Sequence, residues 1–409
     1  MSEPPLINIT KLAMSDFNPP LYYFILHLWM KIFGESEIVL RLLSFIFHLL
    51  LLLIVYKFSQ KLKFSRLNSY CLLLTTFLNP MLIYYSFEIR MYSLLALLAT
   101  SSMYFFFTKN WILYILSSAL GLWTQPFMAF IIISQYFYLL ITRQLVKKHF
   151  FYLLAIIILL SPWIPVTLHQ FSVSGPMWIW RINQTTVTTI LGNLFTGYEG
   201  TPWGLWNKMA FLSLIIIALS IFSIIKLKSK SKIPSPIRQF VPLVITWLFL
   251  PVILVLIISY FKPIYVNRYI IFVTVAEIFI ITISLSLVKN KYIRNLSAVC
   301  FLLFTICFNV WFPPLHRKSD IRSTIKEIVA LAKPRDLIYS QTPLTFFESK
   351  YYADDRSRVF LYNPDLVSVP LYVGQVIMPR KVMATQLPRY PTRAFLVHDD
   401  ASYEVISQK

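Results

Sequence analysis

Acidic side chains that border long apolar runs are the first candidates for chemistry in this sequence. Asp16 and Asn18 lie in the segment Ser15-Asp-Phe-Asn-Pro-Pro-Leu-Tyr-Tyr23, where two prolines enforce a rigid turn. Such a turn would place an acid at the outer membrane surface, where a persisting charge is a candidate for function. The alternative is that Asp16 only caps or closes the turn.

Basic side chains next to tyrosines form the second group of candidates. Glu88 and Arg90 occupy a short turn that leads to Tyr92, and Arg268 precedes Tyr269 at the start of a later apolar run. A guanidinium binds phosphate through paired hydrogen bonds, and Glu88 is placed to orient Arg90 or a substrate hydroxyl. The alternatives are a local ion pair between Glu88 and Arg90, and an ordinary headgroup contact for Arg268.

These residue types predict a site that combines an acid with a bound phosphate, because charges near hydrocarbon are costly and those that persist are usually functional. The predicted catalytic residues are Asp16 and Glu88. The predicted residues for binding a substrate or lipid phosphate are Arg90, Tyr92, Arg268, Tyr269 and Asn18.

No cofactor is predicted with certainty from the sequence. Glycine is scarce, at 8 residues, and there is no Gly-rich phosphate loop, which argues against a nucleotide-driven enzyme or transporter. No metal ligand is assigned, although the acids Asp16 and Glu88 leave a divalent metal open.

The composition indicates an integral membrane protein. The chain has 409 residues, of which 57% are hydrophobic and 13% charged, whereas soluble domains carry about 25% charged residues. The net charge of +21 is typical of nucleic-acid binding in a soluble protein. Here it is better explained by basic loops that contact anionic headgroups, so no nucleic-acid partner is expected.

Ten apolar runs predict about ten membrane-spanning helices, because a span needs about 20 apolar residues and fewer where protein surrounds it. The runs are 37–56, 67–84, 91–107, 111–122, 127–142, 150–168, 209–225, 240–260, 269–288 and 296–311.

Loop charge predicts the orientation of these runs. If they alternate in direction, sixteen basic loop residues share one face and five share the other, so the first face is cytoplasmic. The sixteen are Lys57, Lys61, Lys63, Arg66, Lys109, Arg143, Lys147, Lys148, Lys226, Lys228, Lys230, Lys232, Arg238, Lys289, Lys291 and Arg294. The five are Arg90, Arg181, Lys208, Lys262 and Arg268.

Three parts follow from this pattern. Residues 1–36 form an N-terminal segment at the outer face, with an interfacial helix over 21–33 that ends at Gly34. Residues 37–314 form the transmembrane part, with a long outer loop at 170–207 that contains Trp178, Trp180, Trp203 and Trp206. Residues 315–409 form a small α/β extracytoplasmic region, with a helix from Arg322 and strands from Asp336 and Arg358.

Several motifs resemble the GT-C membrane glycosyltransferases, the relatives of protein O-mannosyltransferases and of the aminoarabinose transferase. The segment from Asn18-Pro-Pro-Leu-Tyr-Tyr to Gly34-Glu-Ser-Glu37, followed by Arg41, is similar to the family's N-terminal motif. Ser86-Phe-Glu-Ile-Arg-Met-Tyr92, Asn267-Arg-Tyr269 and Asp320-Ile-Arg322 are similar to later family motifs. The resemblance covers nearly the whole chain.

This resemblance implies a multi-pass cell-membrane transferase whose active site faces outward. It implies a polyprenyl-phosphate sugar as donor, with mannose or another sugar, and a glycan, lipid or protein as acceptor in or near the membrane lipid. An acid in the first outer loop would act as base, and basic residues would hold the lipid phosphate. Family members begin with a spanning helix that ends in an acidic pair, and this chain is expected to lack that first helix and that acid.

Two other classes of function remain open from the sequence. A transporter or flippase of a lipid-linked glycan would have polar, Gly- or Pro-broken helices that line a path through the bilayer. An inactive family member, or a membrane scaffold, would tolerate replacement of Asp16, Glu88 and Arg268.

Overall fold

The computed structural model describes residues 6–173, 179–198, 205–228, 233–316, 319–370, 373–374 and 377–408. The chain divides into two compact units, Ser2–Leu315 and His316–Lys409. We call them the helical unit and the C-terminal unit, and each is described by itself. The roles assigned above to residues 1–36, 37–314 and 315–409 stay predictions, and Trp178, Trp203, Lys230 and Lys232 lie outside the described residues.

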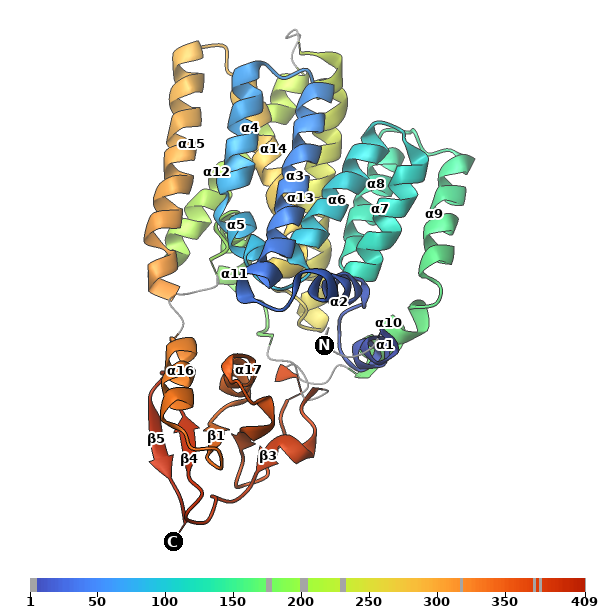
Figure 1. Ribbon diagram of the computed structural model, residues 1–409. Coiled ribbons are helices and arrows are strands. Elements are labelled where there is room, and N and C mark those ends of the chain that lie inside the picture. The colour runs from blue at the N-terminus through green and yellow to red at the C-terminus, as the bar shows by residue number, and fades with distance from the viewer. Residues whose placement is uncertain are drawn as a thin grey trace. The chain divides into compact units, whose positions relative to one another are not determined.

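The helical unit contains α-helices and short 3₁₀ turns in the described residues (Figure 1). The elements are α1 (Leu6–Ser15), α2 (Leu21–Phe33), α3 (Glu37–Lys61), α4 (Arg66–Leu78), α5 (Pro80–Ser86), α6 (Tyr92–Phe107), α7 (Trp111–Thr124), α8 (Met128–Ile141), α9 (Lys147–Leu160), α10 (Ile164–Val173), α11 (Gln184–Thr196), α12 (Trp206–Lys228), α13 (Ser235–Phe261), η2 (Asn267–Ile270), α14 (Phe272–Ser286), α15 (Lys291–Trp311) and η3 (Pro313–His316).

Every predicted run falls on one of these helices or on a broken pair, and the fold is that of an α-helical polytopic membrane protein. Among the described residues, α3, α12, α13 and α15 are long and apolar enough to cross a membrane, and α9 with α10 makes a fifth candidate if that bent pair is one span. The other five runs correspond to shorter helices of 13 to 16 residues. At 1.5 Å per residue these are shorter than a hydrocarbon core of about 30 Å.

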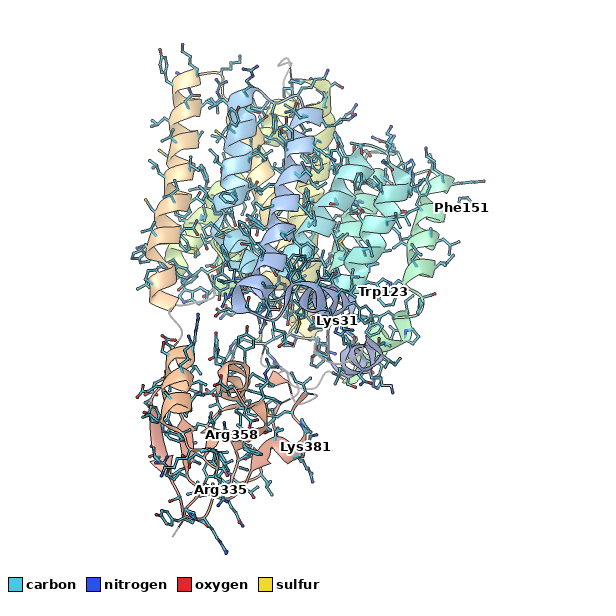
Figure 2. The ribbon with its side chains drawn as sticks, viewed as in Figure 1. Lys31, Trp123, Phe151, Arg335, Arg358 and Lys381 are labelled. Atoms are coloured by element: carbon cyan, nitrogen blue, oxygen red, sulfur yellow. The ribbon has the colours of Figure 1, made fainter. Side chains whose placement is uncertain are left out.

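Apolar side chains cover the outside of the helical unit as well as its core. Helix α14 lies innermost, with every residue from Phe272 to Leu285 buried. At the periphery Phe151 on α9 is 69% exposed and points away from the neighbouring helices (Figure 2). Such a wide apolar surface is suited to contact lipid.

Consecutive long helices run in opposite directions, so their loops gather at two ends (Figure 1). The predicted basic loops between α3 and α4 and between α14 and α15 lie at one end, together with the end of α12 and the start of α13. The helices α2, α5 and α11 lie at the other end (Figure 1), and the turn η2 contacts α11 there. We call this second end the η2 end.

The predicted loop 170–207 is wrong as a loop, because it contains helix α11. The Oδ1 of Asn183 accepts a hydrogen bond from the N–H of Thr186 at 2.8 Å, which caps the start of α11. Gly197 ends the helix with a φ of +70°. A Cβ on Gly192 would lie 2.1 Å from the carbonyl oxygen of Met209, so only glycine permits this close approach of α11 to α12.

Two predicted runs are broken rather than continuous. The run 67–84 divides at Asn79, whose side chain caps α5 through the N–H of Leu82 at 3.1 Å and also donates to the carbonyl of Phe195 at 2.8 Å. The run 150–168 divides between α9 and α10, which meet at an angle of 75°. At both breaks the chain turns toward the η2 end, where its residues can contribute to a site.

The N-terminal helix predicted over 21–33 is present as α2, and it runs across the η2 end (Figure 1). Gly34 ends it with a φ of +90°, and its N–H donates to the carbonyl of Met30. The helix α1 precedes it and was not predicted.

The C-terminal unit is a small α/β fold whose predicted helix and two predicted strands are present. Its strand order is β3-β2-β1-β4-β5, with β5 antiparallel to β4 and the other pairs parallel. The elements are α16 (Ile321–Leu331), β1 (Leu337–Ser340), α17 (Pro343–Tyr352), η4 (Arg356–Arg358), β2 (Val359–Tyr362), η7 (Arg380–Val382), β3 (Met383–Ala384), β4 (Ala394–Val397) and β5 (Tyr403–Ile406).

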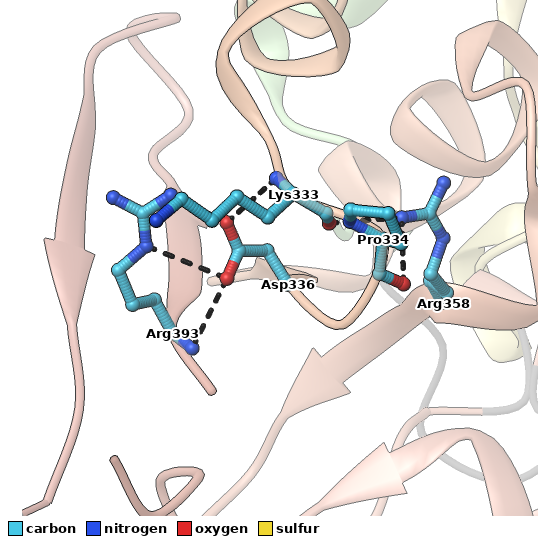
Figure 3. A network of polar contacts seen from close by, with 5 residues as sticks. All are labelled: Lys333, Pro334, Asp336, Arg358 and Arg393. Atoms are coloured by element: carbon cyan, nitrogen blue, oxygen red, sulfur yellow. Dashed lines mark hydrogen bonds and ion pairs between the residues drawn. The ribbon is translucent and has the colours of Figure 1, made fainter. Parts of the chain in front are cut away.

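A buried ion pair joins the starts of β1 and β4 in this unit (Figure 3). The Nη2 of Arg393 lies 2.5 Å from Oδ2 of Asp336, which also accepts from the N–H of Lys333 at 2.8 Å. Asp336 is 3% exposed. Burial opposes its ionisation, but the hydrogen bonds from Arg393 and Lys333 outweigh burial, so the pKa of Asp336 lies below its ordinary value.

We expect Arg393→Ala to destabilise the C-terminal sheet, because it leaves the buried carboxylate of Asp336 without its charged partner. Since the folded-state pKa of Asp336 is lowered, the stabilisation is full above the unfolded pKa and is lost as the pH falls through the folded pKa. Hydrogen exchange of the β1 and β4 amides in the full-length protein measures both effects. Arg335→Ala, at an exposed neighbour, is the matched control, and equal exchange in the two variants would contradict the assignment.

Candidate functional site

The turn η2 holds Arg268 at the η2 end through the residue before it. Asn267 is 5% exposed, and its Nδ2 donates to the carbonyl of Tyr198 at 2.8 Å. The hydroxyl of Tyr265 donates to Oδ1 of Asn267. Because both ends of this amide are engaged, the backbone at Arg268 is fixed between α13 and α14.

Two tyrosines orient the Arg268 guanidinium. Its Nε donates to the hydroxyl of Tyr92 at 3.1 Å. Its Cζ lies 6.0 Å from the centre of the Tyr92 ring and 5.7 Å from that of Tyr269. These distances are within the range of cation–π attraction. The two ring centres are 6.3 Å apart, so Arg268 is held by a tyrosine pair that comes from α6 and η2.

The turn between α5 and α6 brings Arg90 to the same place. Arg90 interacts with the side chain of Tyr92 and lies close enough to Arg268 for their charges to repel. Glu88 partly compensates, with its Oε2 3.7 Å from Nε of Arg90. From α3, Nη1 of Arg41 donates to the carbonyl of Phe87 at 2.9 Å and anchors the turn. Two neighbouring guanidiniums at a half-exposed position are well suited to an anion with several oxygens.

Asp16 lies in the bend between α1 and α2. The Nδ2 of Asn18 donates to its Oδ2 at 3.4 Å, and the side chain of Tyr23 also hydrogen bonds to this carboxyl. Burial raises the pKa of Asp16 above its ordinary value, against these bonds and the Phe17 N–H, which lower it. A carboxyl with a raised pKa is a stronger base once it is ionised.

Tyrosines connect Asp16 to the basic residues. Tyr23 is close enough to Asp16, Arg90 and Tyr92 to interact electrostatically with each of them. Tyr269 has the same relation to Asp16, Arg90 and Arg268. The structure therefore brings the predicted acid and both predicted phosphate-binding arginines together from the α1–α2 bend, the α5–α6 turn and η2.

The remaining predicted residues have supporting positions in this cluster. Asn18 contacts the Asp16 carboxyl, and Glu88 pairs with Arg90. Glu88 thus matches the alternative of a local ion pair in the turn, and its predicted catalytic role is not tested by this geometry. Tyr23 and Gln170, whose Nε2 donates to the backbone carbonyl of Asp16, were not predicted as residues of the site. Tyr23 was visible only as one tyrosine of the motif Leu-Tyr-Tyr, and Gln170 had no signal.

An apolar cavity of about 510 Å³ opens between the start of α12 and the end of α15. Its lining includes Leu205, Met209 and Phe308, which pack against Tyr198. The Tyr198 carbonyl in turn binds Asn267 of η2. Lys208 contributes a positive charge to an otherwise apolar wall, which also includes Phe211, Leu212, Ile215, Cys300, Phe301, Phe304, Cys307 and Trp311.

Among the residues that the structure describes, no group of three or more His, Cys, Asp or Glu side chains is arranged to hold a metal ion.

Comparison with known proteins gives one family match. Residues 18–169 match the model of the dolichyl-phosphate-mannose-protein mannosyltransferases. This region includes Asn18, Glu88, Arg90 and Tyr92, and the match confirms the resemblance to membrane glycosyltransferases predicted from the motifs. No curated protein matches the chain by sequence.

Two solved structures are similar to the chain. They are the crystal structures of ArnT from Cupriavidus metallidurans in the apo state and bound to undecaprenyl phosphate. Each shares 12% sequence identity, with a TM-score of 0.49 over 97% of this chain and 87% of that one.

Proposed function

We propose that this protein is a membrane glycosyltransferase that moves a sugar from a polyprenyl-phosphate carrier to an acceptor hydroxyl. The family match over residues 18–169 supports the class of reaction. The observation that carries the proposal is that two tyrosines at the η2 end link the acid to the cations: Tyr23 interacts with Asp16 and Arg90, and Tyr269 interacts with Asp16, Arg90 and Arg268.

Each part of this cluster has a role in the proposed reaction. Asp16 accepts the proton of the acceptor hydroxyl, whose oxygen forms a bond to the anomeric carbon of the sugar. The bond from that carbon to the phosphate oxygen breaks, and the lipid phosphate leaves with the electron pair. Arg90 and Arg268 stabilise the negative charge that develops on this phosphate. Tyr92 and Tyr269 hold Arg268 in position, and Glu88 orients Arg90.

The loop charges support an extracytoplasmic location for the site. The η2 end carries Arg90, Arg268 and Lys262, whereas the richly basic loops lie at the opposite end. Since Lys and Arg are enriched in cytoplasmic loops, the η2 end faces outward. The acceptor would then approach from outside the membrane, while the donor remains in the bilayer.

The cavity between α12 and α15 supports a donor with a long hydrocarbon chain. Its wall is almost entirely apolar, and Lys208 is placed to meet a negative charge near the membrane surface. The wall is linked through Tyr198 to Asn267, the residue next to Arg268. An isoprenoid chain in this cavity would have its phosphate end near the two arginines.

We expect Cys307→Trp to raise the KM for a long-chain donor at least about tenfold, because a large ring fills part of the cavity. The KM for a donor with a short, soluble isoprenoid should remain within twofold. Steady-state transfer with both donors measures the contrast. Val310→Trp is the matched control, since Val310 is 71% exposed on the same helix and does not line the cavity. Equal effects of Cys307→Trp on both donors would argue against a chain in this cavity.

The proposed function is tested by reconstituting the purified protein in liposomes with radiolabelled polyprenyl-phosphate sugars and candidate acceptors. Time-dependent release of free lipid phosphate together with a labelled acceptor supports a transferase. Movement of intact lipid-linked sugar across the bilayer without its cleavage would instead favour a flippase. A panel of sugars is needed because the residues of the site do not distinguish one sugar from another.

A further inference from the structure

The bend between α9 and α10 brings α10 to the Asp16 segment. Because the chain turns by 75° at this point, α10 runs at the η2 end and meets α1 there (Figure 1). A straight span over 150–168 would carry residue 170 away from this contact. Gln170, near the end of α10, is 8% exposed and is in contact with the last turn of α1.

The side chain of Gln170 forms hydrogen bonds with the backbone of the segment that contains Asp16. Its Nε2 donates to the carbonyl of Ala13 at 2.9 Å, to that of Met14 at 3.5 Å and to that of Asp16 itself. The last carbonyls of a helix have no partner within the helix, so this one amide satisfies acceptors of α1 and of the bend that follows. Gln170 therefore contacts the end of α1 and the bend that carries the Asp16 side chain.

The oxygen of the same side-chain amide is buried, and its position does not stabilise the fold locally. Among the residues that the structure describes, Oε1 of Gln170 has no hydrogen-bond partner. Leaving a buried acceptor unpaired costs about 1–3 kcal/mol. This cost points to a function for the donor contacts that the same amide makes with the Asp16 segment.

The residue after Gln170 is tied to the loop that leads to Arg268. Nζ of Lys262 donates to the carbonyl of Phe171 and lies 4.0 Å from the centre of its ring. Lys262 follows directly on α13, at the start of the segment that enters η2. Two successive residues of α10 therefore bind the segment that bears the acid and the segment that bears the cation.

We propose that Gln170 is a positioning residue that holds Asp16 at its working distance from Arg268, with α10 bracing the two segments. This inference rests on the proposed function. Gln170 acts through the backbone carbonyls of the Asp16 segment. A misplacement of about 1 Å at a reacting group can cost about a hundredfold in rate, so a brace of this kind acts on kcat rather than on donor binding.

Gln170→Leu removes the donor and keeps the size of the side chain, and Gln170→Lys keeps a donor that reaches the same carbonyls. We expect Gln170→Leu to lower kcat by roughly 10- to 100-fold with a donor KM within twofold, because Arg90 and Arg268 remain. The acidic limb of the pH profile should move to lower pH, since a displaced Asp16 is better solvated beside Tyr23 and Tyr269. Gln170→Lys should restore both properties to within about threefold.

If Gln170 only stabilises the fold, Gln170→Leu should have a different effect on the pH profile. Loss of folded protein lowers the amount of active enzyme but leaves the pH limb unchanged, and that result would overturn the proposal. Gln239→Leu, at an exposed glutamine at the start of α13, is the matched control and should change neither property.

A measurement without sugar separates this proposal from the proposed function. A hydrophobic carbodiimide modifies half-buried carboxyls, and mass spectrometry quantifies its reaction at Asp16. We expect Gln170→Leu to change the rate of modification at least threefold and Gln170→Lys to leave it near that of the unmodified chain. If no sugar is transferred but this change occurs, Gln170 does position Asp16 and the proposed class of reaction is wrong. If modification is identical in all variants, Gln170 does not position Asp16.

Discussion

Replacement of Arg268 by Gln is expected to lower kcat for sugar transfer by roughly 100- to 1,000-fold, the cost of removing a group that stabilises developing charge. Arg268 is oriented by the hydroxyl of Tyr92 at 3.1 Å and by two tyrosine rings, so its charge is already in place when the phosphate departs. Gln retains hydrogen-bond donors but carries no charge. The effect should therefore appear mainly in kcat, with a smaller rise in the donor KM.

Arg268→Lys is a sharper version of this experiment. Lys preserves the charge but lacks the planar fork and the stacking between tyrosines. We expect an intermediate loss, of roughly tenfold or more. Arg238→Gln is the matched control, because Arg238 is an exposed arginine at the start of α13, at the end of the helical unit opposite to η2. If Arg268→Gln transfers sugar as fast as this control, the phosphate is not held at η2.

Replacement of Asp16 by Asn is expected to reduce transfer by roughly 100- to 10,000-fold, as for loss of a general base. The amide keeps the shape of the side chain and its contacts with Asn18 and Tyr23 but cannot take the acceptor proton. In the unmodified chain the base is active when ionised, so the rate should rise with pH through the pKa of Asp16. Because burial raises that pKa, the rising limb should lie above the ordinary value of about 4 for an aspartate.

The pH profile also serves as the check on this assignment. The rising limb should be absent from the residual activity of Asp16→Asn. Asp365→Asn, at an exposed carboxyl of the C-terminal unit, is the matched control and should retain both rate and limb. If Asp16→Asn keeps the rising limb and most of the rate, another acid is the base. Asp16 then only closes the turn between α1 and α2.

The two arginine positions and the acid were accessible from sequence because each leaves a local signal. A charge that interrupts apolar runs stands out against its neighbours, as Arg90 and Arg268 do, and the cost of burying charge gives the pattern a physical meaning. The helices themselves follow from the same property. Length and apolar composition predicted α3, α12, α13 and α15, with ends that differ from the observed ones by up to five residues, and amphipathic spacing predicted α16.

Features that depend on contacts between distant segments left no such signal. The sequence predicts a loop where helix α11 lies, although Asn183 and Gly197 are favourable capping residues. The buried face of α11 packs on α12 and α14 but does not form a regular apolar stripe in the sequence, so periodicity does not reveal the helix. The 75° bend after α9 does have a local signal, because Pro162 and Pro165 interrupt the helix there, but the two prolines do not determine the direction that α10 takes. That direction is stabilised by what α10 meets at the η2 end.

Gln170 is the clearest case of this division. Composition and periodicity describe a residue by its neighbours along the chain, and nothing near Gln170 marks it as different from a polar residue at the end of a span. Its meaning comes from the carbonyls of Ala13 and Asp16, which lie more than 150 positions earlier. Apolar burial acts on whole segments and is therefore readable locally, whereas a hydrogen bond between two segments exists only once packing has brought them together.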